Sequence, residues 1–351
     1  MTEIAHGPRT AAVPGLGVTA LLLGAVVLGA VLGLSDPALG ASLSQGIDPT
    51  LAVMLALLFF EVRLRAVAVG VANLRFIALA WIANFLIVPV IGFTIASLFL
   101  TGHPLLYVGL LIYFLAPCTD WFLAFTRMAR GDTALGAVLV PINLLTQFLL
   151  FPVWLWLFTR QAGVVDFGIV PDLMLHWFLL PFGAAQVARW LLARMLSAVA
   201  FDRVCEGFGL LIPVVTAALV FQILAANLVS ITAHLNVFGL ILLAILVFFV
   251  VTFGVADGLS RLFGLRYREQ ALLTMTTAAR NAPLMLALTA IAIPDQPLVY
   301  AALVIGMLVE FPHLTVVKQL LLTKAIRGTT AWPSGRGLRD YSGKSRARPD
   351  P

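Results

Sequence analysis

The sequence has little charge. Only 11% of its 351 residues are Asp, Glu, Lys or Arg, whereas 61% are hydrophobic and the mean hydropathy is +1.04. Soluble globular proteins carry about 25% charged residues. The composition therefore excludes a soluble globular protein and predicts a polytopic helical membrane protein, with no large soluble domain between its apolar runs.

Cysteine is almost absent. The two cysteines, Cys118 and Cys205, provide neither a disulfide framework nor a C-x-x-C metal motif. A nucleotide site is also missing, because the sequence Gly343-Lys344-Ser345 has Leu338 where a phosphate loop needs its first glycine, and no strand precedes it. We expect no cofactor, and any transport must then be driven by a gradient.

Ten apolar runs are long enough to cross a bilayer. They cover residues 13–34, 49–69, 74–100, 104–126, 133–158, 169–190, 206–228, 235–258, 270–292 and 297–322. The first run lacks a cleavage site of small residues, so we expect it to be retained as a helix. The sequence thus predicts an all-α fold of ten transmembrane helices.

The basic residues set the expected orientation. All 22 Lys and Arg residues except Arg160 and Arg280 fall in segments on one side of the predicted helices. By the positive-inside rule, both termini are then cytoplasmic and the protein is a multi-pass protein of the cell membrane. This topology across the lipid bilayer accounts for the basic pI, and we expect no nucleic-acid partner. Residues 328–351 are polar and basic, which is typical of a disordered tail.

Two of the predicted spans are interrupted near their centres. In the fourth, Pro117, Cys118, Thr119 and Asp120 follow one another, and an aspartate at that depth costs roughly 2.5–3.5 kcal/mol unless it faces protein or water. The ninth span contains the sequence Arg280-Asn281-Ala282-Pro283. Proline breaks helices, and a broken helix with a polar centre is tolerated only where it lines a cavity.

Broken spans at matching places in two halves are typical of inverted repeats. Residues 1–159 and 160–327 would each hold five helices, with opposite orientation because five is odd. The offset of 163 residues from Cys118 to Asn281 also relates Gln147 to Glu310, the polar centres of spans five and ten. We therefore predict two inverted five-helix repeats, with helices 4 and 9 crossing at mid-membrane.

The interruptions bring together a small set of chemical groups. Its members are Cys118, Thr119, Asn143, Gln147 and Asn281 as candidate substrate ligands, and Asp120, Arg280 and Glu310 as candidates for ion pairing or proton coupling. Each has a structural alternative. The thiol can be a small packing group, the carboxylates can form a salt bridge with Arg280, the amides of helix 5 can bond between helices, and Asn281 can cap a half-helix. We expect Asn84 on helix 3 to be structural.

Four segments carry a resemblance to a known superfamily. APCTDWFLAFTRMARGD, PINLLTQFLLFP, TTAARNAPLMLALTAIA and GMLVEFPHL resemble the bile acid:sodium symporters and arsenite efflux permeases, and more closely the permeases. That branch has a cysteine in helix 4, matching Cys118, and a glutamate two residues before a proline in helix 10, matching Glu310. Both are taken as essential to metalloid transport, so the resemblance implies transient metalloid binding at Cys118. The fold that it implies has helices 4 and 9 crossing in a core of helices 3–5 and 8–10.

The chain departs from both branches of that superfamily. The permeases usually have arginine, not Pro117, before the cysteine. The sodium-coupled bile acid transporters have a glutamate and a glutamine where this chain has Thr276 and Arg280. A fixed positive charge repels sodium, so we expect the sodium site to be lost.

Three functions follow as hypotheses. The first is a secondary active transporter that exports arsenite, and by extension antimonite, by proton-coupled alternating access. The second is a carrier of small organic anions, with Arg280 binding a carboxylate. The third is an intramembrane protease, since Gly131-Asp132 resembles part of such a site; no partner aspartate lies on a neighbouring span, so we expect no enzyme.

Overall fold

The computed structural model describes residues 16–62, 73–119, 121–159, 174–232, 235–294 and 296–330. Over these ranges the chain forms helices joined by turns and short extended segments, so it is all-helical as predicted. In chain order the elements are α1 (Leu16–Ser35), α2 (Pro37–Ser42), η1 (Leu43–Gly46), α3 (Ile47–Glu61), α5 (Leu74–Ile82), η3 (Ala83–Ile87), α6 (Val88–Leu100), α7 (Pro104–Leu115), α8 (Trp121–Met128), α9 (Thr133–Thr159), η4 (Met174–Leu179), α11 (Leu180–Met195), α12 (Ala198–Thr232), α13 (Leu235–Leu262), α14 (Tyr267–Ala278), α15 (Ala282–Ala292) and α16 (Pro297–Thr330).

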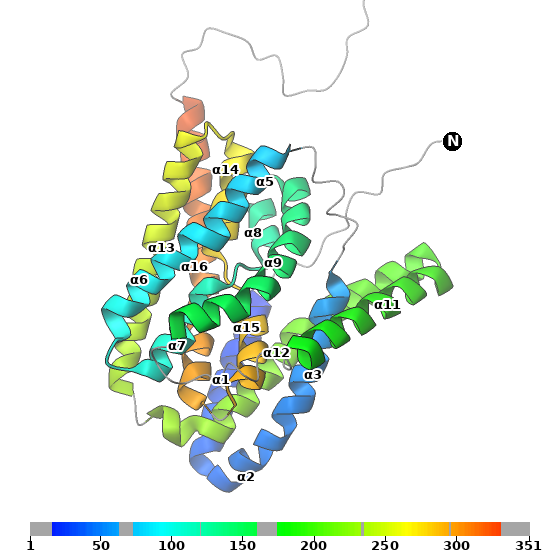
Figure 1. Ribbon diagram of the computed structural model, residues 1–351, viewed down its shortest axis with the longest axis vertical. Coiled ribbons are helices and arrows are strands. Elements are labelled where there is room, and N and C mark those ends of the chain that lie inside the picture. The colour runs from blue at the N-terminus through cyan, green and yellow to red at the C-terminus, as the bar shows by residue number, and fades with distance from the viewer. Residues whose placement is uncertain are drawn as a thin grey trace, which may run out of the picture.

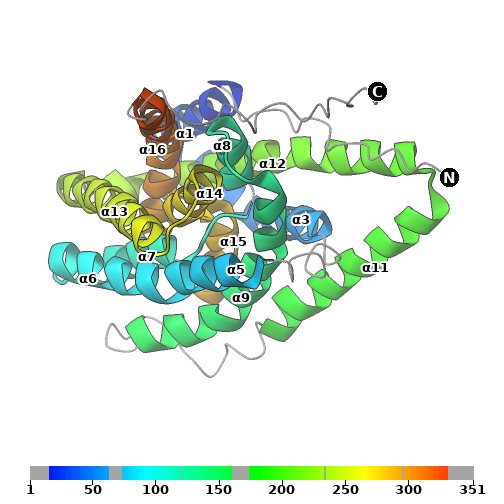
Figure 2. The same ribbon diagram turned by 90° about the horizontal axis from the view of Figure 1, so that it is seen from above.

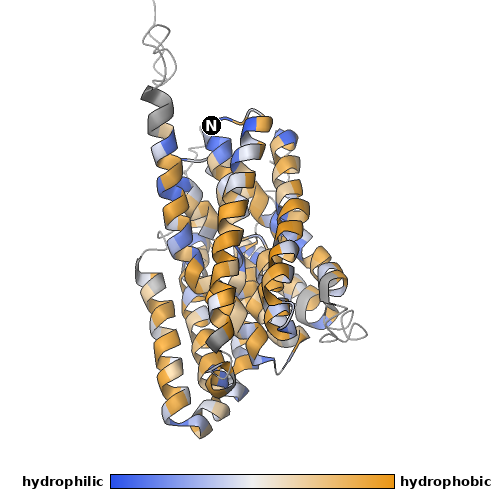
Figure 3. Ribbon diagram, turned by 90° about the vertical axis from the view of Figure 1, so that its left-hand side faces the viewer, coloured by the Kyte–Doolittle hydropathy of each residue, from blue (hydrophilic) through white to orange (hydrophobic). Residues whose placement is uncertain are grey.

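Many of these helices are suited to a membrane. Within the described ranges, six continuous helical stretches are long and apolar enough to span a bilayer, and α7 and residues 20–35 are shorter apolar helices. Hydrophobic residues dominate most of the length of the helices (Figure 3). The chain is thus a multi-span membrane protein by its helix composition.

The second span begins earlier than the apolar run suggested. Pro37 takes the first position of α2, and the Asp36 side chain accepts a hydrogen bond of 3.0 Å from the main-chain nitrogen of Leu39, which caps the helix. A short 3-10 turn then joins α2 to α3, which ends at Glu61. The prediction of 49–69 was therefore too late at its start, because the capping signal lies outside the strongly apolar run.

Small residues hold α1 close to α12. A Cβ atom on Gly29 would lie 2.8 Å from the main-chain oxygen of Phe221, and one on Gly33 would lie 2.9 Å from that of Ala225. Real Cβ atoms do not approach so closely, so only glycine permits this contact. The G-x-x-x-G pattern therefore serves packing within the chain.

The two interrupted spans are each built from two helices. One consists of α7 and α8, and the other of α14 and α15 (Figure 1). Seen from above, α14 and α15 lie among the other helices, between α13 and α9, whereas α11 lies at the edge (Figure 2). The broken helices are therefore in the interior, where packing and polar contacts can support non-helical backbone.

Candidate functional site

Both helix breaks occur where the sequence placed them. The helix α7 ends at Leu115, and Ala116 adopts an extended conformation with φ −104° and ψ 108°. A residue that precedes proline is forced away from the helical region, so Pro117 explains this break. The helix α14 ends at Ala278, Ala279 is likewise extended, and Pro283 lies in the first turn of α15, where proline is tolerated.

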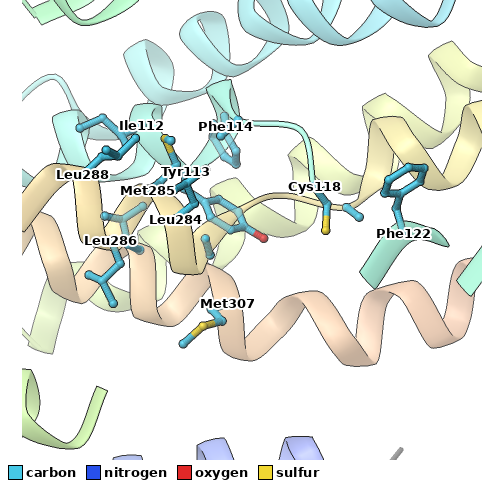
Figure 4. Close-up of a cluster of buried hydrophobic side chains, with 14 of the residues drawn as sticks. Ile112, Tyr113, Phe114, Cys118, Phe122, Leu284, Met285, Leu286, Leu288 and Met307 are labelled. Atoms are coloured by element: carbon cyan, nitrogen blue, oxygen red, sulfur yellow. The ribbon is translucent and has the colours of Figure 1, made fainter. Parts of the chain in front are cut away.

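The two extended segments pair with each other. The main-chain nitrogen of Cys118 donates to the oxygen of Ala279 at 3.1 Å, and that of Asn281 donates to the oxygen of Ala116 at 2.9 Å. Together these bonds form an antiparallel bridge between Pro117 and Arg280. Figure 4 shows Cys118 on its extended segment next to the extended segment of the other broken helix. The pairing satisfies backbone groups that the breaks would otherwise leave without partners.

The Arg280 side chain is fully buried beside this pairing. Its Nη1 donates to the main-chain oxygen of Phe114 at 3.0 Å, and its Nη2 donates to those of Thr276 and Thr277 at 3.1 and 2.7 Å. These oxygens belong to the last turns of α7 and α14, where a helix leaves carbonyl groups unpaired and its dipole favours a cation. The guanidinium thus caps two converging helix ends, and its carbon also lies 5.7 Å from the centre of the Phe248 ring.

Glu310 reaches the same place from α16. Its side chain is 2% exposed, and its Oε1 accepts a hydrogen bond of 3.0 Å from the main-chain nitrogen of Arg280. The carboxylate and the guanidinium also interact electrostatically. A carboxylate beside a buried guanidinium balances its charge, which neither group could carry alone in this environment.

Three other predicted residues lie at the crossing. Cys118 and Thr119 are buried, and the Asn281 amide donates to the hydroxyl of Thr119 at 3.0 Å. Asn281 occupies the N-cap position of α15, but its side chain makes no capping bond. The Asn281 amide therefore connects the two broken spans. The alternative that Asn281 caps the half-helix α15 with its side chain is wrong.

The amides of α9 are buried but differ in their contacts. Asn143 donates to the Thr276 hydroxyl at 3.3 Å, as expected of a bond between helices. Gln147 has no hydrogen-bond partner for either of its polar atoms within the described part of the chain. Asn84 is fully buried and donates to the same Thr276 hydroxyl at 3.0 Å, which is compatible with the structural role predicted for it.

A signal for Asn84 is visible only in the structure. Asn84 lies in η3, a single π-helical turn in the middle of the third span. Such turns occur often at functional sites. The sequence around Asn84 contains no glycine and has its proline only at position 89, so nothing in it marks this turn.

Two further predictions concern the ends of α8. Asp120 lies outside the described residues. The pair Gly131-Asp132 forms the turn before α9, where an Asp132 oxygen accepts bonds of 3.1 Å from the main-chain nitrogens of Ala134 and Leu135. This is a helix cap, so a structural role accounts for the pair that suggested a protease.

Apolar spanning helices with two broken members, and a buried cation between their ends, are the features of a secondary transporter. The comparison with known families agrees, since residues 48–254 match the sodium bile acid symporter family. The match covers more than half of the chain, so the protein belongs to this family and is a membrane transporter, not an enzyme.

One curated relative has a more specific name. The chain is 29% identical over 257 residues to the arsenical-resistance protein Acr3 of Corynebacterium glutamicum, and the match covers 66% of each chain. The chain therefore spans just under two thirds of that relative's length.

Proposed function

We propose that this protein is a secondary active transporter that exports arsenite, and antimonite by the same chemistry, across the cell membrane in exchange for protons. The observation that carries this proposal is the position of the Cys118 thiol, which is 1% exposed and hydrogen-bonded through its main chain to the second broken helix. Trivalent arsenic is soft and favours sulfur ligands, as soft metals do. The similarity to an arsenical-resistance protein supports the same substrate.

The thiol would bind its cargo by ligand exchange. Undissociated arsenous acid carries three hydroxyl groups; when the sulfur bonds to arsenic, one hydroxyl leaves with the thiol proton as water, and no electron is transferred. A single thiol holds arsenic less firmly than two or three would, which suits a carrier that has to release its cargo. Thr119, Asn143, Gln147 and Asn281 would complete the substrate site.

The coupling ion in this proposal is the proton. The guanidinium of Arg280 already occupies the helix ends where transporters of this kind hold a coupling cation. Glu310 would then take up and release the proton, and Asp120 is the second candidate for this role. An organic-anion carrier is the alternative; the engagement of both terminal nitrogens of Arg280 with carbonyl oxygens favours arsenite over it.

The architecture proposed with this function is ten membrane helices in two inverted repeats, residues 1–159 and 160–327, whose broken fourth and ninth helices cross at mid-membrane. Residues 328–351 would form a basic cytoplasmic tail, and both termini would be cytoplasmic. Element bounds support the repeat: an offset of 163 residues moves Pro104 and Leu115, the ends of α7, onto Tyr267 and Ala278, the ends of α14.

Efflux from cells that lack other arsenite exporters tests the proposal. Cells that produce the protein should accumulate several-fold less arsenite, and Cys118→Ser should abolish this effect. The matched control is Cys205→Ser, because Cys205 is the other cysteine of the chain and lies on α12, away from the crossing. Full arsenite efflux by Cys118→Ser would remove the thiol from the mechanism.

A further inference from the structure

Polar side chains from three elements meet at the hydroxyl of Thr276. Asn84 from η3 and Asn143 from α9 both donate their amide nitrogens to this oxygen. Their amide oxygens, Asn84 Oδ1 and Asn143 Oδ1, are buried and have no hydrogen-bond partner among the residues that the structure describes. Gln147 lies one helical turn beyond Asn143 and adds a third amide. Its oxygen and its nitrogen are also buried and have no hydrogen-bond partner among the described residues. We refer to these four residues as the amide cluster.

Such a group of buried acceptors needs an explanation. A buried polar atom without a partner destabilises the folded state, and native proteins retain few of them. The amide cluster concentrates three amide oxygens, and the π-helical turn that carries Asn84 departs from regular helix geometry at the same place. A bound ligand that donates hydrogen bonds to these oxygens would account for both features.

The charges around the cluster define the ligand. The cluster has no ionisable side chain, and the Arg280 guanidinium is hydrogen-bonded to the main-chain oxygen of Thr276 itself. This fixed positive charge disfavours a metal cation at the amide oxygens. Carbonyl oxygens of amides also disfavour an anion, because they carry partial negative charge. The remaining class is a small neutral molecule with hydroxyl groups.

The cluster is also close to the thiol. Thr276 lies in the last turn of α14, and Ala279, the extended residue that directly follows this helix, accepts the main-chain hydrogen bond of Cys118 at 3.1 Å. Three residues of helix correspond to a rise of about 4.5 Å. In the site that we infer, a small molecule bound to the sulfur extends towards the amide oxygens.

We propose that the amide cluster is a hydroxyl-binding subsite and that Asn84 determines specificity for the fully hydroxylated, undissociated form of the metalloid. The inference rests on the proposed function. After one hydroxyl of arsenous acid leaves as water, two remain on arsenic, and the oxygens of Asn84 and Asn143 accept hydrogen bonds from them. Arsenic compounds in which methyl replaces hydroxyl lose these bonds and place an apolar group against an amide oxygen.

Binding of arsenous acid and dimethylarsinous acid to the purified full-length protein tests this inference. Both compounds form the arsenic–sulfur bond with loss of water, but bound dimethylarsinous acid keeps no hydroxyl on arsenic, so the ratio of the two dissociation constants isolates the hydroxyl contacts. Isothermal titration calorimetry in detergent should show that Asn84→Leu weakens binding of arsenous acid about tenfold more than binding of dimethylarsinous acid, the effect of one hydrogen bond. The control Thr94→Val, on an exposed position of α6, should leave the ratio unchanged.

The outcomes separate the inference from the function on which it depends. If Asn84→Leu weakens both ligands equally, Asn84 is only structural and the inference is wrong, while metalloid binding stands. If the wild-type protein binds neither compound, the proposed function is wrong and the inference with it. Asn84→Ala removes the same oxygen and replaces Asn84→Leu if that variant does not fold.

Discussion

The stability of the crossing should depend on charge balance between Arg280 and Glu310. Both side chains are buried, at 0% and 2% exposure, and a Glu310 oxygen lies 3.0 Å from the main-chain nitrogen of Arg280. Removing one partner of a buried ion pair costs about 3–5 kcal/mol, because the other charge stays buried without compensation. We expect Arg280→Met and Glu310→Gln each to lower the free energy of unfolding by this amount.

The double variant should be more stable than the two single effects imply. It leaves no unbalanced charge between these two positions, so its loss should fall short of the sum by roughly 2–3 kcal/mol. The carbonyl groups of Phe114, Thr276 and Thr277 lose the guanidinium in both Arg280→Met and the double variant, so this contribution cancels in the cycle. Unfolding in mixed micelles with increasing dodecyl sulfate, followed by circular dichroism, provides the four free energies.

A control cycle uses a carboxylate elsewhere. Asp257 on α13 forms salt bridges with Arg261 and Lys324 and, among the residues that the structure describes, shares no partner with Arg280. Combining Arg280→Met with Asp257→Asn should be additive within about 0.5 kcal/mol. Additivity of the Arg280 and Glu310 variants as well would refute the reasoning, since Glu310 would then not balance the guanidinium.

Three further predictions address coupling and packing. Because Arg280 occupies the converging helix ends, replacing sodium by choline should leave arsenite efflux from proteoliposomes unchanged, and a several-fold loss would identify sodium as the coupling ion. Gly29→Val should lower the free energy of unfolding by about 1–3 kcal/mol, because the new side chain pushes against the backbone of Phe221. The control Gly24→Ala has open space around its Cβ and should not destabilise the protein. Asp132→Ala should cost about 1 kcal/mol through loss of the α9 cap, whereas Asp132→Asn should cost little.

The sequence predicted the breaks well because their cause is local. Pro117 restricts the residue before it whatever the tertiary environment, and Pro283 stops α14 from continuing as a regular helix into α15. Burial of Arg280 and Glu310 also agrees with the sequence, since charged groups in apolar spans face protein rather than lipid.

The partners of these residues were harder to predict. The electrostatic interaction of Arg280 with Glu310 agrees with one of the predicted alternatives. The hydrogen bonds of the Arg280 terminal nitrogens were not predicted, because they reach main-chain carbonyls whose directions depend on where α7 and α14 end. The contacts of Asn84 were hard to predict for a related reason. Its role depends on a π-helical turn and on a hydroxyl 192 residues away, and neither leaves a periodic signal in the sequence.

The proposed repeat also explains why Gln147 is left without a partner. Two hydrogen bonds form the bridge, from Cys118 to Ala279 and from Asn281 to Ala116. The offset of 163 residues relates the two donors, Cys118 and Asn281, and likewise the two acceptors, Ala116 and Ala279. The same offset moves Gln147 onto Glu310, which accepts a hydrogen bond from the main-chain nitrogen of Arg280.

The equivalent donor for Gln147 would be the main-chain nitrogen of residue 117. That residue is proline, which has no N–H group to donate. The main-chain nitrogen of Arg280 therefore holds the Glu310 carboxylate of α16 in place. Within the described part of the chain, the Gln147 amide of α9 has no equivalent hydrogen bond. In the proposed repeat, a single residue, Pro117, thus breaks the symmetry between a half that balances charge and a half whose amide we propose to be a ligand of the substrate.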